Sequence, residues 1–329
     1  MIEATGLTKR YGSKVAVDHM TFTVAPGKVT GFLGPNGAGK STTMRMIVGL
    51  DRPTSGSVTV NGRRYAEHSA PLHEVGTLLD AKAVHTGRSA YNHLLAQAAT
   101  HGIGRKRVQE VIEMTGLDAV ARKRVGGFSL GMGQRLGIAS ALLGDPQTLI
   151  LDEPVNGLDP EGVLWVRNLV QYLARQGRTV FLSSHLMSEM AVTADHIIVV
   201  GRGRLIADAP VAEIVARAAG TTVRVRTPQA GALEELVRGP EVTVTSAEPG
   251  LIEITGSTAP AIGEAAAAAG IVLHELTPLH GSLEDAYMQL TADSVEYHSS
   301  DVGQPAAPAT APSPTTPGAT SSATEGAVR

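Results

Sequence analysis

The chain has 329 residues, which is enough for one large α/β domain and a smaller one. Its net charge of −3 argues against a surface that binds nucleic acid through charge. Because the chain has no cysteine, disulfides, thiolate metal sites and a cysteine nucleophile are excluded.

The N-terminal region carries alternating segments, such as 20–24 and 57–61, which predict an antiparallel sheet. The chain starts directly in a strand pattern, without the basic and apolar regions of a secretory signal. No apolar stretch approaches the roughly 18 to 20 residues that cross a bilayer. We therefore expect a cytoplasmic protein without a membrane span of its own.

A glycine-rich loop follows an apolar strand pattern at 29–33 and opens a helical pattern that begins at Ser41. Its residues match G-x-x-x-x-G-K-[ST], namely Gly34, Pro35, Asn36, Gly37, Ala38, Gly39, Lys40, Ser41 and Thr42. In such a loop the backbone N–H groups surround a phosphate, the lysine neutralises β- and γ-phosphate oxygens, and the Ser41 hydroxyl can ligate Mg²⁺. The segment predicts a binding site for a nucleoside triphosphate.

Helical periodicity dominates from residue 81 to residue 125, where apolar positions recur on helix faces. A further helix is predicted after Ser129, whose hydroxyl is a candidate N-cap. The amides after such a cap form an anion-binding helix end, although an ordinary capped helix has the same pattern.

An apolar strand at 148–151 ends in two adjacent carboxylates, Asp152 and Glu153. On extended backbone these side chains point to opposite faces, so we expect Asp152 to hold Mg²⁺ and Glu153 to orient or deprotonate the attacking water. The alternative is an exposed turn, which leaves unexplained why two charges follow an apolar strand in a chain with a phosphate loop.

Three more segments complete a resemblance to the ATP-binding-cassette ATPases. Residues 128–132 with 134–135 resemble the signature loop, 156–160 resemble the D-loop, and 179–185 form a strand pattern that ends in a switch histidine, His185. The five motifs lie in the family's order over roughly residues 2 to 210. The resemblance implies an α/β P-loop NTPase domain over 1–210, with an antiparallel β subdomain and a helical subdomain at about 81–140 that touches a membrane partner.

The resemblance also assigns roles to individual residues. Ser129 and Gly131 of the signature loop would contact ATP held by a second copy of the chain, and Asp159 would belong to the D-loop. Leu130 and Met132 depart from the usual signature pattern. Tyr11 is similar to the aromatic residue that stacks on adenine, although a tyrosine in an edge hairpin is the alternative.

Asp80 stands at a strand end where the family normally has glutamine. As a carboxylate it would approach Mg²⁺ only when the dimer is closed, because the γ-phosphate repels it unless the metal lies between them. The alternative is a residue that caps the next turn.

The C-terminal part predicts a small α+β domain over 211–290. After a helix at 211–218, strands are expected at 222–226, 241–245, 250–254 and 271–274, with helices at 230–238, 259–269 and 282–290. The β-α-β-β-α-β order suggests a ferredoxin-like fold. Residues 291–329 are rich in Ala, Pro, Ser, Thr and Gly and are expected to be a disordered tail.

These features favour the ATP-hydrolysing motor subunit of a bacterial exporter, similar to those that power drug or antibiotic efflux. The resemblance implies ATP and Mg²⁺ as cofactors, and a second copy and a separate integral membrane permease as partners, with no nucleic acid. It places the chain peripherally at the cytoplasmic face of the cell membrane. Alternatives are a non-transport cassette that acts on the ribosome or nucleic acid, and a cassette that binds ATP without hydrolysis. One P-loop without heptads disfavours the first, and Glu153 with His185 disfavours the second.

Overall fold

The computed structural model describes residues 1–80, 83–218, 222–240, 242–279 and 282–291. The expected tail falls outside these residues except for Thr291, which ends the last helix. In the described part of the chain, no helix has both the length and the apolar character needed to span a membrane.

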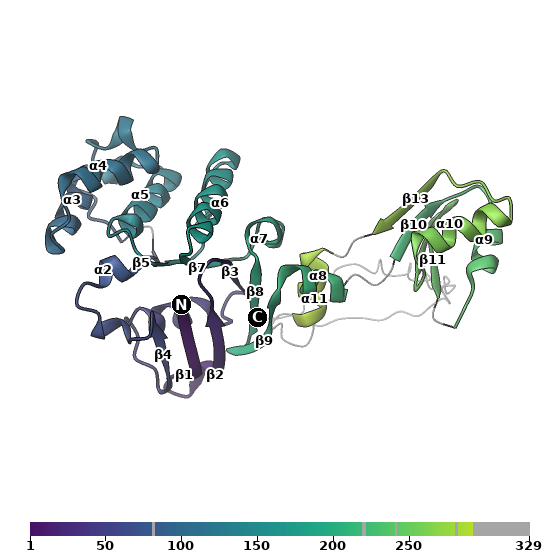
Figure 1. Ribbon diagram of the computed structural model, residues 1–329, viewed down its shortest axis with the longest axis horizontal. Helices are drawn as coiled ribbons and strands as arrows, with labels where there is room; N and C mark the ends of the chain where they lie inside the picture. The colour runs from purple at the N-terminus through teal and green to yellow at the C-terminus, as the bar shows by residue number, and fades with distance from the viewer. Residues whose placement is uncertain (81–82, 219–221, 241, 280–281, 292–329) are drawn as a thin grey trace, which may run out of the picture. The chain divides into compact units, whose positions relative to one another are not determined.

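The first sheet is the expected antiparallel one (Figure 1). It consists of β1 (Ile2–Tyr11), β2 (Lys14–Val24) and β4 (Ser55–Val60), with β1 in the middle. Along β1 and β2 buried positions alternate largely with exposed ones, because one face packs on the core and the other meets solvent.

The second sheet has six strands in the order β5-β6-β7-β3-β8-β9. They are β3 (Val29–Leu33), β5 (Val75–Leu78), β6 (Thr148–Leu151), β7 (Thr179–Ser184), β8 (His196–Gly201) and β9 (Arg204–Pro210). All neighbours are parallel except β9, which is antiparallel to β8. Every residue of β3, β6 and β7 is buried, which confirms that their apolar runs predict central strands covered on both faces.

Two cores fill the two faces of this sheet. On one face Ile150, Phe32 and Phe181 pack with α1 (Lys40–Ile47) and the first sheet, and the rings of Phe32 and Phe181 lie 5.0 Å apart. On the other face Leu149 and Leu151 pack with α6 (Pro160–Arg175), α7 (Met187–Thr193) and the helical subdomain. The sheet therefore fixes where each strand's C-terminal end, and the loop that follows it, can lie.

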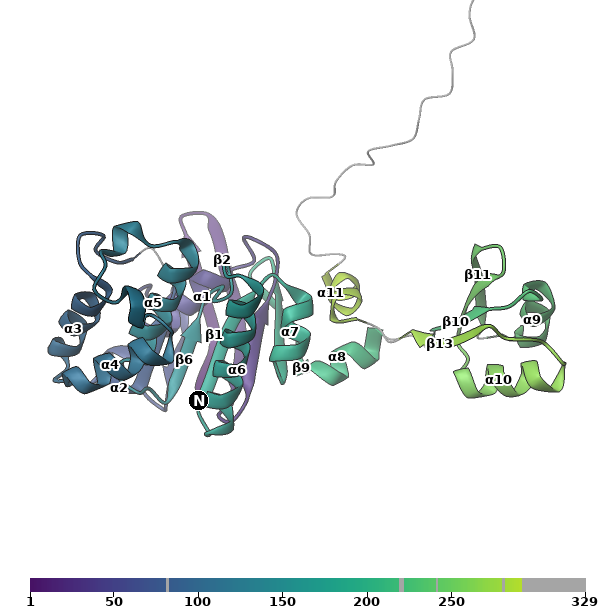
Figure 2. The same cartoon turned by 90° about the horizontal axis from the view of Figure 1, so that it is seen from above.

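The helical subdomain consists of α3 (Ala90–Thr100), α4 (Arg105–Met114) and α5 (Leu130–Leu142), which lie together in both views (Figures 1 and 2). Short helices lie at α2 (Pro71–Glu74), Tyr65–Glu67, Asp118–Val120 and Val125–Gly127. The apolar faces predicted on α3 and α4 are buried, with Leu94, Ala98, Val108, Val111 and Ile112 in the larger core. The predicted helical region is thus confirmed.

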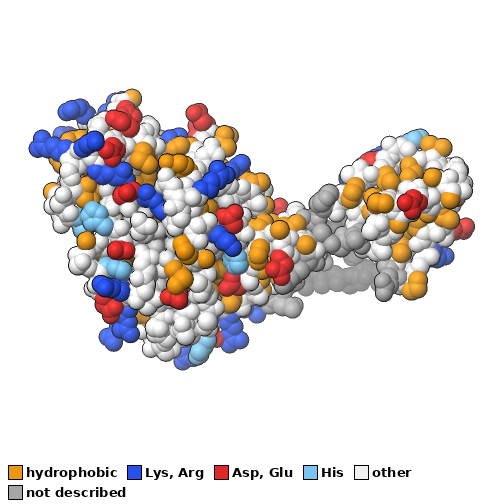
Figure 3. All heavy atoms as spheres, viewed as in Figure 1, with side chains coloured by type: hydrophobic (Ala, Val, Ile, Leu, Met, Phe, Trp, Pro, Cys, Tyr) orange, Lys and Arg blue, Asp and Glu red, His pale blue; other side chains and the backbone are white. Residues whose placement is uncertain are grey.

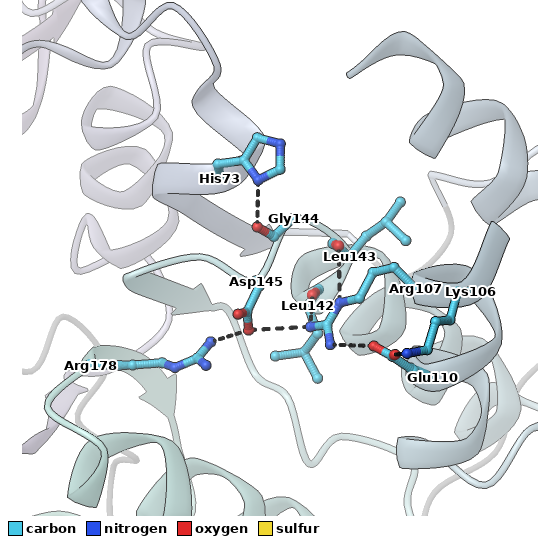
Figure 4. Close-up of polar contacts among 9 residues, drawn as sticks. All are labelled: His73, Lys106, Arg107, Glu110, Leu142, Leu143, Gly144, Asp145 and Arg178. Carbon is cyan, nitrogen blue, oxygen red and sulfur yellow. Dashed lines mark hydrogen bonds and ion pairs between the residues drawn. The ribbon is translucent and has the colours of Figure 1, made fainter. Parts of the chain in front are cut away.

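A polar cluster around Arg107 joins α4 to the end of α5 (Figure 4). Its guanidinium donates to the carbonyl oxygens of Leu142 at 2.7 Å and Leu143 at 3.3 Å, at the end of α5. The Leu142 carbonyl also accepts from the Asp145 N–H at 3.0 Å. The same group forms ion pairs with Glu110 and with Asp145, which also pairs with Arg178 at 2.9 Å. Arg107 therefore ties the helical subdomain to the loop before β6.

We expect Arg107→Met to lower the melting temperature by several degrees. The change removes the side-chain donor of the Leu142 and Leu143 carbonyls and one of the two arginines that pair with Asp145. Such losses cost about 1–3 kcal/mol, or roughly 2–4 °C per kcal/mol in a domain of this size. Thermal unfolding followed by circular dichroism measures the shift. Lys106→Met is the matched control, because the Lys106 side chain is 92% exposed. Equal melting temperatures for the two variants would contradict the role given to Arg107.

The C-terminal module has the predicted β-α-β-β-α-β order. Its elements are β10 (Thr222–Arg226), α9 (Ala230–Val237), β11 (Thr243–Glu248), β12 (Leu251–Thr255), α10 (Ala259–Ala268) and β13 (Glu275–Leu279). The strands form one antiparallel sheet in the order β11-β12-β10-β13, which is the ferredoxin-like topology.

The position of its last strand differs from the prediction. The strand runs over Glu275–Leu279, not over 271–274, and Glu275 pairs with Arg226. Ile271 is buried in the module's core, and the Val272 N–H donates to the Gln229 side chain at 3.1 Å. The apolar run therefore reflects a loop that packs on the core, while the strand itself is more polar.

The helices that bracket the module pack elsewhere. Ile214 of α8 (Val211–Ala218) and Leu283, Ala286 and Tyr287 of α11 (Leu283–Thr291) belong to the core of the larger domain. Among the residues that the structure describes, the module's own core draws on positions between 223 and 276. This division differs from the expected boundaries at 211 and 290, because the apolar faces of α8 and α11 are buried on the larger domain.

Candidate functional site

The glycine-rich loop connects β3 to α1 as predicted. Gly39 has φ of 99°, and a Cβ there would lie 2.5 Å from the carbonyl oxygen of Ala16. Gly37 also has a positive φ, of 82°. Only glycine adopts such backbone angles without strain, so the loop can turn its amides inward ahead of the helix.

Lys40 is almost fully buried in this loop. Its Nζ donates to the carbonyl oxygens of Gly34 at 2.7 Å and Pro35 at 3.2 Å. Burial lowers the pKa of Lys40, and the nearby charges of Glu153 and Asp152 oppose this shift. The ammonium is therefore held at the loop, where it is poorly solvated and available to an anionic ligand.

A cleft of about 530 Å³ brings the motifs together. Its lining includes the loop residues Asn36, Gly37, Gly39, Lys40, Ser41 and Thr42, the acidic pair Asp152 and Glu153, and Tyr11, Lys14, Ala16 and Leu79. Lys14, Ala16 and Leu79 were not predicted, because nothing in their local sequence marks them. Their place follows from the approach of β2 and β5 to the loop.

Ser183 on β7 connects the two carboxylate residues. Its hydroxyl donates to Oδ1 of Asp152 and accepts from the backbone N–H of Glu153 at 2.9 Å. Leu151 of β6 pairs with Leu182 of β7, so the residues that follow these two, Asp152 and Ser183, also lie side by side. Ser183 was missed from sequence because this pairing brings together residues 31 positions apart.

Glu153 does not continue the strand, which ends at Leu151. Its φ is 50°, so the expectation that its side chain alternates with that of Asp152 along extended backbone is wrong. Its carboxylate Oε2 accepts from Nδ1 of His185 at 2.7 Å, and its backbone carbonyl accepts from Nε2 of Gln134 at 2.9 Å. Glu153 and His185, the two residues predicted to be catalytic, are thus in contact. The left-handed backbone at Glu153, and not an extended strand, brings its carboxylate to His185.

The signature and D-loop segments lie at helix starts. The Ser129 hydroxyl accepts from the Met132 N–H at 3.2 Å and caps α5, as predicted. Asp159 caps α6 in the same way through the Gly162 N–H at 2.9 Å. Ser129, Gly131 and Asp159 do not line the cleft that holds the phosphate loop.

Tyr11 and Asp80 lie differently with respect to the cleft. Tyr11 lines it with a 48% exposed side chain, its hydroxyl donates to Asp51 at 3.0 Å, and Nζ of Lys9 lies 4.9 Å from its ring centroid. Asp80 is exposed and is not among the lining residues, although Leu79 beside it is. The Asp80 carbonyl accepts from the Ala83 N–H at 3.2 Å.

Oxygen donors suited to a hard cation line the cleft. The Ser41 hydroxyl and the Asp152 carboxylate are of the type that Mg²⁺ prefers. Among the described residues there is no group of three or more His, Asp and Glu that could hold a metal by itself. The donor set therefore fits an ion that also takes phosphate or water ligands.

Comparison with known proteins gives the family. A family model described as ABC transporter matches residues 17–156, and one described as Domain of unknown function (DUF8746) matches residues 221–284. The bacitracin transport ATP-binding protein BcrA of Bacillus licheniformis is 44% identical over 213 residues, which cover 64% of this chain and 70% of that protein. YdbJ of Bacillus subtilis, an uncharacterized ABC transporter ATP-binding protein, is 32% identical over 294 residues, with 88% and 95% covered.

Solved structures agree. The ATP-binding subunit of an ABC transporter superposes with a TM-score of 0.61 at 26% identity, covering 66% of this chain and 92% of that one. A dimeric bacterial ABC transporter cassette superposes with a TM-score of 0.60 at 23% identity, covering 64% of this chain and 99% of that one. This likeness shows the fold. The chain therefore belongs to the ATP-binding proteins of ABC transporters and is an ATPase with their P-loop fold.

Proposed function

We propose that this chain is the ATP-hydrolysing subunit of an exporter and works at the cytoplasmic face of the membrane, bound to a separate permease. The observation that carries the proposal is one cleft in which the phosphate loop, Asp152 and Glu153 meet, with His185 bonded to Glu153. The name of BcrA, a bacitracin transport protein, supports an antibiotic-like cargo.

In the proposed reaction the loop amides and Lys40 hold the β- and γ-phosphates. Ser41 and Asp152 would hold Mg²⁺, which neutralises charge on the phosphate oxygens. Glu153 orients the attacking water and accepts its proton. His185 donates to the Glu153 carboxylate, which keeps that side chain turned toward the cleft. Tyr11 would stack on the adenine at the mouth of the cleft.

A second copy would complete each site. Ser129 and Gly131 lie at the start of α5, outside the cleft of their own chain, where amide groups and the helix end favour an anion. We propose that they contact the γ-phosphate bound to the partner copy, with Asp159 of the D-loop close to the dimer contact. The fold shared with a dimeric cassette supports this arrangement.

We propose that the Asp80 carboxylate approaches Mg²⁺ when the dimer is closed. Its side chain is exposed, and the adjacent Leu79 lines the cleft. A movement of Asp80 toward the cleft would bring a carboxylate to Mg²⁺, which prefers carboxylate to amide oxygen.

The mixture of charges on one face of the larger domain is consistent with a protein partner and does not favour nucleic acid on that face. On the face shown in Figure 3, Lys and Arg side chains are interspersed with Asp and Glu over the larger domain. Nucleic-acid binding needs a sustained basic face.

Co-expression tests the transport role. When it is co-expressed with its permease, the chain should move from the supernatant into the membrane pellet, because the helical subdomain would dock on the permease. The detergent-solubilised complex should hydrolyse ATP. The matched control is co-expression with an unrelated membrane protein. If the chain stays in the supernatant with both membrane proteins, the transport role is contradicted.

A further inference from the structure

The backbone of Glu153 is held in an unfavourable conformation. Its φ of 50° is in the left-handed region, which non-glycine residues rarely occupy. Such a conformation persists only when surrounding contacts fix it, and it is common where function demands a particular side-chain direction. The contacts that fix Glu153 therefore decide where its carboxylate points.

Three side chains bond to Glu153, each at a different group. Ser183 accepts from its N–H, His185 donates to its carboxylate, and Gln134 donates to its carbonyl oxygen at 2.9 Å. Ser183 and His185 come from β7 and the residue after it, so they belong to the same sheet edge. Gln134 comes from the helical subdomain and is only 4% exposed.

Gln134 lies close to the start of its helix. It is one turn after Leu130, and Ser129 caps this helix end. The first turn of α5 also packs on the segment that follows Glu153: a Cβ on Gly157 would lie 2.2 Å from Cδ2 of Leu130, and one on Gly131 would lie 3.3 Å from the Gly157 carbonyl oxygen. Leu130, which departs from the usual signature, thus fills the space that glycine leaves at residue 157.

We propose that Gln134 is a positioning residue, which links the signature end of α5 to the catalytic carboxylate of the same chain. The link rests on the function proposed above, in which the partner's nucleotide meets Ser129 and Gly131. When that nucleotide binds, it pulls the start of α5 toward itself. The hydrogen bond from the Gln134 amide then shifts the Glu153 carbonyl in the same direction. Hydrolysis in one cleft thereby depends on occupancy of the other.

The test replaces the amide donor of Gln134. Gln134→Glu keeps the size but removes the N–H group and places a carboxylate against the Glu153 carbonyl. Gln134→Met is the neutral second variant, in case the carboxylate prevents folding. Because misplacement of a reacting group by about 1 Å can cost about 100-fold, we expect kcat to fall at least about tenfold. The Kd for ATP should stay within about twofold, and the Hill coefficient for ATP should fall toward 1.

Gln171→Glu is the matched control. Gln171 on α6 also donates from its side-chain amide to a backbone carbonyl, that of Val192 at 3.0 Å, but away from the cleft. Parent-like kcat and Hill coefficient in both Gln134 variants would overturn the proposal, and so would an equal fall of kcat in Gln171→Glu. If the parent chain shows no ATP hydrolysis, the proposed function fails first, and the inference fails with it.

Discussion

Glu153→Gln is expected to lower the rate of ATP hydrolysis by about 10²–10⁴-fold, the usual contribution of a general base. The amide cannot accept the proton of the attacking water. Its carbonyl oxygen can still accept from His185 Nδ1, which lies 2.7 Å from the carboxylate in the parent, so the shape of the site should be kept. ATP should remain bound, and an ATP-bound dimer should accumulate.

Phosphate release at saturating ATP measures the rate, and size-exclusion chromatography with ATP measures the dimer. Glu161→Gln is the matched control, because it makes the same change of charge at an exposed residue in the first turn of α6. A Glu153→Gln variant that stays monomeric and hydrolyses ATP at the parent rate would contradict the role proposed for Glu153.

Lys40→Met should weaken ATP binding by at least about 100-fold, since a buried cation that contacts phosphate oxygens gives strong charge-assisted bonds. Burial already lowers the pKa of Lys40, so the ammonium pays a desolvation cost that bound phosphate would offset. Methionine has a similar length and no charge. The variant should therefore fold and fail to hold the nucleotide.

Thermal unfolding with and without ATP provides the measurement. ATP at 100 times its Kd stabilises the parent by about 2.7 kcal/mol, and this increase should be absent in Lys40→Met. Lys28→Met, at an exposed position before β3, should keep it. An unchanged increase in Lys40→Met would show that Lys40 does not hold the phosphates.

The sequence by itself determined the elements whose signals are local. The strand, loop and helix around Lys40 follow from an apolar run and from glycines that adopt positive φ. The caps at Ser129 and Asp159 lie at helix starts because their side chains bond amides three residues on. Strands buried on both faces were recognisable because residues 149–151 and 180–182 are continuous apolar runs.

Two predictions of extended strand from the local sequence were wrong, because tertiary packing favours another conformation there. The apolar residues at 271–273 predicted a strand, but Ile271 packs into the small core from a loop and the strand begins at Glu275. Glu153 looked like a continuation of β6, but hydrogen bonds from side chains far along the chain hold it in the left-handed region.

Only the tertiary structure decided the contacts that surround the catalytic carboxylate. Ser183 reaches Asp152 because the register of β6 against β7 places Leu151 beside Leu182. Gln134 reaches Glu153 because α5 packs with its start against the segment after β6. These contacts join residues separated by 19 to 31 positions. Register and helix packing depend on the whole core, so no short stretch of sequence contains them.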